Sequence, residues 1–105
     1  MSGRSSRQKG ANAEREVVAI LKERGYDVHR VPHSGALEWM KGDVIGFPAL
    51  IEVKRCEALR ISEWCAKAEE QADGKTALLI FRRSREPWRC VLLLSEFLRL
   101  MEVGK

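Results

Sequence analysis

The sequence predicts a mixed α/β domain, in which helices pack on a central β-sheet. Two separated segments, residues 11–24 and 61–72, repeat apolar side chains at helical spacing. Short runs of strand length lie between and after them, and residues 76–81 form a largely apolar run typical of a strand covered on both faces. The expected order is helix, three strands, helix, two strands and a last helix.

The composition is that of an ordinary globular chain, and its 105 residues suit a single domain spanning residues 1–105. The net charge of +4 favours an anionic partner such as nucleic acid, without identifying it. No apolar run approaches the roughly 18 residues of a membrane span, and the N-terminus lacks a signal-peptide core, so an intracellular location is expected. The three cysteines lack close spacing, which argues against a disulfide framework or a zinc knuckle.

The first helix is expected over residues 11–24, with Gly25 as a left-handed cap at its end. Residues 1–10 contain basic residues and no acid, so they are expected to form a flexible basic arm, either a disordered start or a tail that grips phosphate. Glu14 borders the apolar stripe of this helix. The helix dipole also favours a glutamate in a first turn, so both a structural and a catalytic role stay open for Glu14.

A strand is expected over residues 26–31, and residues 32–41 then form a turn and a loop. Loops on a rigid scaffold often hold functional residues, so four loop residues are candidates by location: His33, Ser34, Glu38 and Trp39. His33 is more simply a solvated loop residue. Trp39 either plugs an edge of the core or offers a surface for base stacking.

The centre of the chain is expected to fold as a hairpin, because a turn of Gly, Phe and Pro separates two short apolar runs. Strand alternation in the second run places Glu52 and Lys54 on one face, with Ile51 and Val53 on the other. Glu52 and Lys54 are then roughly 7 Å apart along the strand. The hairpin brings Asp43 from the first run towards them, so two acids and a lysine are expected at one sheet edge.

The second half begins with a helix over residues 61–72, closed by Gly74, and a strand over residues 76–81 follows. Three arginines occupy the next turn, which is either a solvated hairpin tip or a contact to phosphates. A further strand is expected over residues 88–94. Ser95 then caps a last helix, whose apolar side consists of Phe97, Leu98 and Met101.

Asp43 and Glu52, placed together, would repel each other unless a cation lay between them, and oxygen ligands suit a hard ion such as magnesium or manganese. Lys54 beside them makes sense if an anion is also present. In phosphodiester hydrolysis a metal polarises the phosphate and an ammonium stabilises the charged oxygens. Glu14 from the first helix could complete the set of carboxylates.

Asp43, Glu52 and Lys54 could also have a purely structural role. Glu-x-Lys on a strand is common as a solvent-facing ion pair, and an aspartate at a strand start is common as a turn residue. The run of residues 49–54 is otherwise apolar enough for the centre of a sheet, where unpaired charges are costly. This cost favours the catalytic interpretation.

Gly42-Asp43 followed by Glu52-x-Lys54 resembles the signature of PD-(D/E)XK nucleases, with glycine where many members have proline. A series of blocks resembles the archaeal-type Holliday junction resolvases in order and spacing: Lys9-Gly10-x-x-x-Glu14-Arg15-Glu16, Gly25-Tyr26-x-Val28-x-Arg30, Ser34-Gly35, Asp43 and Ile51-Glu52-Val53-Lys54. The resemblance covers roughly the first half of the chain. Compact phage and prophage nucleases of this superfamily are similar to the chain as well.

The resemblance implies a restriction-endonuclease-like fold and a Mg²⁺-dependent endonuclease, with Mn²⁺ as a substitute. It implies the metal-site acids Glu14, Asp43 and Glu52, a further ligand in the Val53 carbonyl, the catalytic lysine Lys54, and Ser34 near the scissile strand. The expected substrate is branched DNA such as a Holliday junction, in DNA recombination or repair. The expected protein is a homodimer in the cytoplasm of a prokaryotic or phage-infected cell.

Phosphate contacts are expected from a pool of basic residues: Arg4, Arg7, Lys9, Arg30, Arg55, Arg82, Arg83 and Arg85. Two other functions stay open, a non-catalytic nucleic-acid-binding module and a phage nuclease with another DNA specificity. The resemblance to the resolvases does not extend to the helix that carries Trp64 or to the hairpin from Arg82 to Trp88. Gln71 on the same helix either reaches the site or is simply exposed.

Overall fold

The computed structural model describes residues 3–32 and 41–102, with side chains from residue 8 onward. The elements are, in chain order, α1 (Gly3–Glu23), β1 (His29–Arg30), β2 (Val44–Ile45), β3 (Leu50–Arg55), α2 (Ile61–Ala72), β4 (Ala77–Arg82), β5 (Arg89–Val91) and α3 (Leu94–Glu102). The five strands form one sheet in the order β1-β2-β3-β4-β5. Only the β3–β4 pair is parallel in this sheet, so the predicted mixed α/β architecture is confirmed.

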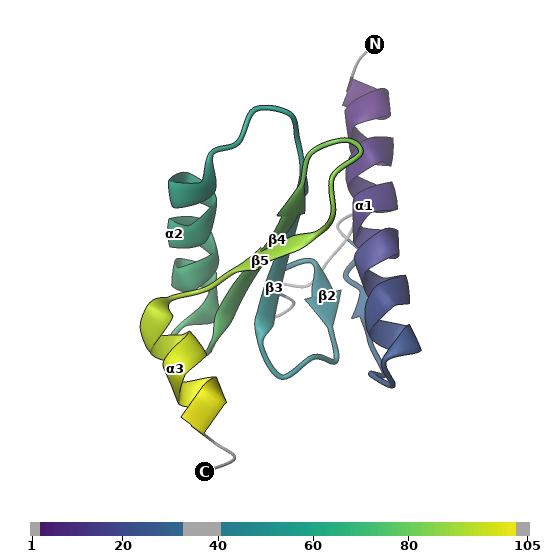
Figure 1. Ribbon diagram of the computed structural model, residues 1–105. Coiled ribbons are helices and arrows are strands. Elements are labelled where there is room, and N and C mark those ends of the chain that lie inside the picture. Colours follow the sequence, from purple (N-terminus) through teal and green to yellow (C-terminus); the bar gives the residue numbers. More distant parts are fainter. Residues whose placement is uncertain (1–2, 33–40, 103–105) are drawn as a thin grey trace.

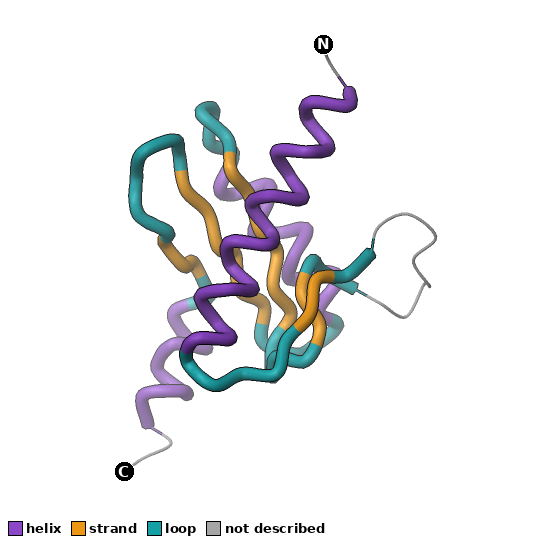
Figure 2. Tube along the Cα trace, turned by 90° about the vertical axis from the view of Figure 1, so that its right-hand side faces the viewer, coloured by secondary structure: helices purple, strands orange, loops and turns teal. Residues whose placement is uncertain are grey.

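The sheet lies between two helices, with α1 on one face and α2 on the other (Figure 1). Seen from the side, α1 crosses in front of the strands while α2 lies behind them (Figure 2). The parallel pair β3–β4 is joined through α2, as a crossover between parallel strands requires. In the described part of the chain, no helix has the length and apolar character needed to cross a membrane.

Helix α1 starts at Gly3, well before the predicted start near residue 11. Residues 3–10, which the sequence assigned to a flexible basic arm, belong to this helix. The arm contains no proline, and its Arg, Gln and Lys residues are good helix formers, so the helix tolerates Gly10 at a cost of about 1 kcal/mol. Glu14 consequently lies in mid-helix, where the helix dipole does not explain it.

The end of α1 is the predicted one. Gly25 has a φ of 96°, and its N–H donates to the Lys22 carbonyl at 3.0 Å. The N–H of Tyr26 donates to the Leu21 carbonyl at 3.1 Å, which completes a Schellman motif. Glycine is suited to this position because it adopts a positive φ without steric cost.

The alternation predicted for β3 is confirmed by its packing. Ile51 and Val53 join a buried cluster with Ala13 and Val17 of α1. Their neighbour Leu50 packs against a second cluster formed by three alanines, Ala68, Ala72 and Ala77. Since alternate residues share a face, Glu52 and Lys54 point to the side of the sheet covered by α2.

Two predicted strands are shorter than expected. β1 contains only His29 and Arg30 of the predicted residues 26–31, because its one partner is the two-residue β2. β5 covers Arg89–Val91 of the predicted residues 88–94 and pairs only with β4. Both are edge strands, so each forms backbone hydrogen bonds with only one neighbouring strand, and a longer extended segment would have few partners.

The cap residues of the last two helices differ from the predicted ones. At the end of α2 it is Asp73 that adopts the left-handed conformation of the C-cap, and Gly74 follows with a φ of 88°. Helix α3 starts at Leu94, and the N–H groups of Glu96 and Phe97 donate to the Leu93 carbonyl. Ser95 therefore lies inside the first turn and is not the N-cap.

Candidate active site

The candidate site begins where β2 and β3 separate. The two strands pair through Val44 and Ile51, and the N–H of Asp43 donates to the Ile51 carbonyl at 2.8 Å. Asp43 Oδ2 accepts a hydrogen bond of 2.7 Å from the Val53 N–H, while the Asp43 carbonyl accepts one of 3.0 Å from the Val31 N–H. These bonds fix the backbone and the carboxylate of Asp43 against β3.

Gly42 is required by the backbone that leads into Asp43. Its φ is 77°, and a Cβ at this position would lie 2.8 Å from the Ile51 carbonyl oxygen. Proline, which holds φ near −65°, could not adopt this conformation. The glycine that departs from the usual PD-(D/E)XK signature therefore has a local structural reason.

The buried charged side chains of the described residues are three carboxylates, Glu14 (7% exposed), Asp43 (8%) and Glu52 (7%). All three line one open cleft of about 860 Å³, together with Val53 and Lys54. They come from α1, from the turn before β2 and from β3, so only the folded chain brings them together. Burial of several carboxylates is costly unless cations or hydrogen bonds compensate.

Glu14 forms an ion pair with Arg30, a residue that the sequence placed among the expected phosphate contacts. The Arg30 Nε donates to Glu14 Oε1 at 2.7 Å, which joins β1 to the middle of α1. This charged hydrogen bond partly compensates the burial of the Glu14 carboxylate. Arg30 is therefore engaged within the protein, where it holds the cleft residue Glu14.

A hard divalent cation fits the donor set of this cleft in part. Among the described residues, no group of three His, Cys, Asp or Glu side chains is arranged to hold a metal ion. Mg²⁺, however, commonly binds through one or two carboxylates and completes its shell with water and phosphate oxygens. Asp43 and Glu52 would supply the two carboxylates, and Val53, whose carbonyl was the predicted further ligand, lines the same cleft.

Basic residues also line the cleft, and the sequence identified only some of them. Lys9 and Arg55 belong to the predicted pool, whereas Lys41 and Lys67 were missed. Gln71, half-buried, lines the cleft as well, so it does reach the site. Lys67 and Gln71 are four positions apart on α2, a spacing that places two side chains on one helix face. The sequence therefore shows that Lys67 and Gln71 share a helix face, but it does not say that this face of α2 meets the cleft.

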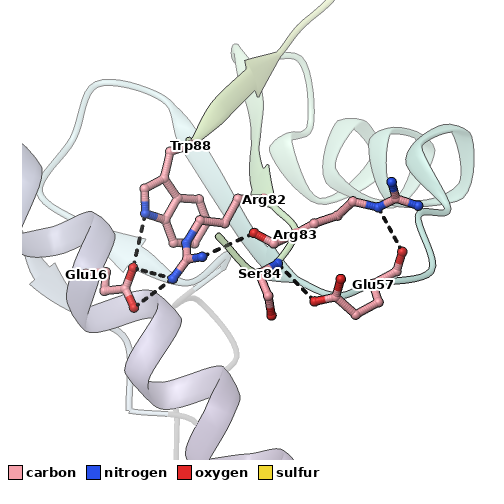
Figure 3. A network of polar contacts seen from close by, with 6 residues as sticks. All are labelled: Glu16, Glu57, Arg82, Arg83, Ser84 and Trp88. Atoms are coloured by element: carbon pink, nitrogen blue, oxygen red, sulfur yellow. Dashed lines mark hydrogen bonds and ion pairs between the residues drawn. The ribbon is translucent and has the colours of Figure 1, made fainter. Parts of the chain in front are cut away.

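Arg82 is engaged inside the protein, although it was expected among the phosphate contacts. Its guanidinium donates to both oxygens of Glu16 on α1, at 3.1 and 3.3 Å, and lies 5.1 Å from the ring of Trp88. Trp88 Nε1 donates to the same carboxylate at 3.2 Å (Figure 3). The Arg82 side chain is only 14% exposed. This three-residue network joins α1 to β4 and to the start of β5.

The tip of the β4–β5 hairpin is tied to the loop that follows β3. Arg83 Nε donates to the Glu57 carbonyl at 3.1 Å, and the Ser84 N–H donates to the Glu57 carboxylate at 2.9 Å (Figure 3). Hydrogen bonds from the side chain and backbone of Ser84 hold the pKa of Glu57 below its usual value. Glu57 and Ser84 both line the cleft, so the hairpin tip forms part of its wall.

Several predicted residues lie outside the described part. These are Ser34 and its loop neighbours His33, Glu38 and Trp39. The side chains of Arg4 and Arg7 are not described either, although their backbone belongs to α1. Arg85 lies exposed at the hairpin tip, outside the residues that line the cleft.

A mixed sheet between helices, with two acids and a lysine where two strands separate, defines the PD-(D/E)XK class of α/β proteins. The chain belongs to the family described as "Phage putative PDDEXK endonuclease", whose model matches residues 5–103. The searches of curated proteins and of solved structures found no match. The predicted PD-(D/E)XK membership is confirmed by the family match, and nucleases of this class typically use a divalent metal.

Proposed function

We propose that this protein is a Mg²⁺-dependent endodeoxyribonuclease that cleaves branched DNA, such as a Holliday junction. The observation that carries the nuclease activity is the convergence of three buried carboxylates and Lys54 on one cleft. The basic residues along the cleft supply the attraction for DNA that the carboxylates alone would lack. The choice of branched DNA rests on the resemblance to the resolvases.

Asp43 and Glu52 hold the divalent cation in this proposal, together with the Val53 carbonyl, and Glu14 assists them. The ion, when bound, supplies Lewis-acid polarisation of the scissile phosphate, and Mn²⁺ can replace Mg²⁺. Asp43 needs little reorganisation, because the Val53 N–H already orients its carboxylate.

Lys54 stabilises the negative charge that develops on the phosphate, or orients the attacking water. An ammonium suits this task because it carries three hydrogen-bond donors and a compact charge. Ser34 is proposed near the scissile strand on the resemblance alone. Phosphate contacts are proposed from Lys9 and Arg55 in the cleft, from the exposed Arg83 and Arg85, and from Arg4 and Arg7.

The second candidate function is a basic module that binds nucleic acid without cleaving it. The three buried carboxylates speak against this function, because acids in a phosphate-binding cleft weaken binding and are costly to bury. The module would bind DNA without metal, and neutralising Asp43 or Glu52 would strengthen that binding. A phage nuclease with another DNA specificity would share the proposed site and differ only in substrate.

The test is a cleavage assay on a four-way junction beside a flap, linear duplex and single strand, with Mg²⁺, with Mn²⁺ and with EDTA. We expect cleavage of the junction with either metal and none with EDTA. The variants Asp43→Asn, Glu52→Gln and Lys54→Ala should each lower kcat by about 100-fold or more, because each removes charge stabilisation from the transition state.

Two exposed residues outside the cleft, Glu63 and Lys22, give matched controls. Glu63→Gln and Lys22→Ala should cleave as the wild type does. Unchanged activity in any of the three cleft variants would remove the proposed site. Equal cleavage of all substrates would remove the branched-DNA specificity and leave the nuclease activity standing.

We further propose that the protein is a homodimer that pairs through α3. Helix α3 exposes five apolar residues, Leu94, Phe97, Leu98, Leu100 and Met101. At helical spacing Leu94, Phe97, Leu98 and Met101 form one stripe, and Leu100 lies outside it. The opposite, polar side faces the body of the protein, where Thr76 donates to Glu96 at 2.6 Å and Arg99 donates to Thr76 at 2.7 Å. An amphipathic helix in this orientation leaves its apolar stripe for a partner to cover.

A second copy suits this stripe better than a lipid surface or DNA. The charged residues of α3 are Glu96, Arg99 and Glu102, whereas helices that bind anionic lipid or DNA carry mostly basic residues. In an antiparallel pair, Glu102 of one helix would lie near the N-terminus of the other, where the helix dipole favours an acid. The stripe would thus form the self-complementary contact that a two-fold axis requires.

A further inference from the structure

Trp64 has no role in the site described so far, although it lies beside one of its residues. The Nζ of Lys54 lies 5.8 Å from the centroid of the Trp64 ring, within the reach of a cation–π interaction. Both side chains are half-buried. Among the described residues, Lys54 lines the cleft and Trp64 does not.

The packing of α2 explains how Trp64 reaches Lys54. Ala68 and Ala72 are buried in one cluster, against which Leu50 at the start of β3 packs. Helix α2 runs back along the sheet, so Trp64, one turn before Ala68, reaches the far end of β3 where Lys54 lies. The small alanines allow α2 to lie close to the strand and bring the indole over the ammonium.

Lys54 needs such a support because of its own chemistry and its surroundings. A lysine side chain has four rotatable bonds and high rotamer entropy, so an unsupported ammonium spreads over many positions. The cleft carboxylates attract the Lys54 ammonium, while Lys41, Arg55 and Lys67 in the same cleft repel it, so the charges of the cleft do not by themselves fix one position for it. An aromatic face attracts the ammonium without accepting its N–H groups in a hydrogen bond, so these donors stay available for phosphate or water.

We propose that Trp64 is a positioning residue for Lys54, which it holds through its ring face while Lys54 acts on the phosphate. This inference rests on the proposed nuclease function, because it takes Lys54 as the group that acts on the DNA. It assigns no DNA contact to Trp64 itself. Substitution of Trp64 should therefore change kcat and leave the KM for DNA nearly unchanged.

The kinetic test compares Trp64→Phe with Trp64→Leu. Phenylalanine keeps a ring face, although a weaker one, and leucine keeps apolar volume without it. We expect kcat to fall by about 3-fold in the Phe variant and by about 10- to 30-fold in the Leu variant. Glu70→Ala, at an exposed position of the same helix, is the control and should match the wild type.

The contact itself is measured by NMR on protein labelled with ¹³C-lysine, without DNA or metal. The Trp64 ring should shift the side-chain resonances of Lys54, and the shift should disappear in Trp64→Leu. Thermal melts show that each variant is folded at the assay temperature. A purely structural role would lower kcat in proportion to lost stability, with Phe no better than Leu.

The outcomes separate this inference from the proposed function. If Lys54→Ala cleaves as well as the wild type, the proposed function of Lys54 fails, even if the NMR contact is present. If Lys54→Ala is inactive while Trp64→Leu keeps the wild-type kcat, the positioning role of Trp64 is overturned. A resonance of Lys54 that does not respond to Trp64→Leu would overturn it as well.

Discussion

Asp43, a proposed metal ligand, shows how the backbone places a single carboxylate. Its N–H and its carboxylate both bond to the backbone of β3, and the residue before it adopts a left-handed conformation. The backbone therefore holds the carboxylate in a fixed place in the cleft, as the proposed metal site requires. Gly42 makes this arrangement possible, because any side chain there would approach the Ile51 carbonyl.

Gly42→Ala tests this dependence on the backbone. A Cβ would lie 2.8 Å from the Ile51 carbonyl oxygen at a positive φ, so we expect a loss of about 1–3 kcal/mol in the free energy of unfolding. Cleavage should fall as well, because Asp43 moves. Chemical denaturation measures the stability.

Gly10→Ala is the matched control for Gly42→Ala. Gly10 lies within α1, and no atom lies within 4 Å of an added Cβ. The same substitution should therefore stabilise the protein by about 0.4–1 kcal/mol. A destabilisation of equal size at both positions would show that the backbone argument for Gly42 is wrong.

The elements of the site are held in place by ion pairs between segments far apart in the sequence. Glu16 and Arg82 are 66 residues apart, and their contact fixes α1 against β4. Glu14, on the same helix, is held by Arg30 of β1. The depth at which Glu14 enters the cleft thus depends on how these two arginines hold α1.

Arg82→Lys tests the network at the level of the helix. Arg82 Nη2 donates to both Glu16 oxygens while Nη1 donates to the Arg83 carbonyl. Lysine keeps the charge but lacks the planar group that makes these bonds together and stacks on Trp88. We expect a loss of about 1–3 kcal/mol in the free energy of unfolding, measured by chemical denaturation.

Arg89→Lys is the control for this prediction. Arg89 pairs with Glu86 three residues away, and both side chains are largely exposed. Such pairs contribute little, so the change should stay within about 0.5 kcal/mol. Equal effects of the two substitutions would indicate that the Arg82 network does not hold α1 in place.

On the scale of the whole molecule, α3 differs from the other two helices. α1 and α2 bury residues against the sheet, while α3 has no buried residue and exposes its apolar stripe. Its polar side is held against the body of the protein by Thr76, which donates to Glu96. The hydrogen bonds from Thr76 and Arg99 hold the pKa of Glu96 below its usual value. A symmetric pair of chains would place two clefts in one particle, which suits cleavage of two strands at a junction.

Leu98→Glu tests the proposed dimer. The wild type should have twice the 12.0 kDa mass of one chain in light scattering or sedimentation, and the variant should have the mass of one chain. A charge in the centre of the stripe would lose apolar burial and bring two acids together in the contact.

Ile20→Glu, at an exposed apolar position of α1, is the control and should stay dimeric. Circular dichroism should show the same helix content in the variant, the control and the wild type. A monomeric wild type at high concentration would disprove the homodimer. A dimer that survives Leu98→Glu would place the contact elsewhere.

The sequence alone determined the architecture and most of the candidate site. The helical spacing around Val17 and Ala68 and the alternation through Ile51 depend on local periodicity, which the chain carries wherever it folds. Gly25 ends α1 as expected, because a left-handed cap is a local requirement. The grouping of Asp43, Glu52 and Lys54 followed from one hairpin and strand alternation, both short-range features.

Only the tertiary structure decided which charges meet. Arg30 and Arg82 look like free phosphate contacts in the sequence, yet each bonds to a glutamate on α1 that lies far away along the chain. The face of α2 that carries Lys67 and Gln71, and the indole of Trp64 over Lys54, depend on how the helix docks on β3. Local spacing fixes which side chains share a face, whereas packing and register fix what that face meets.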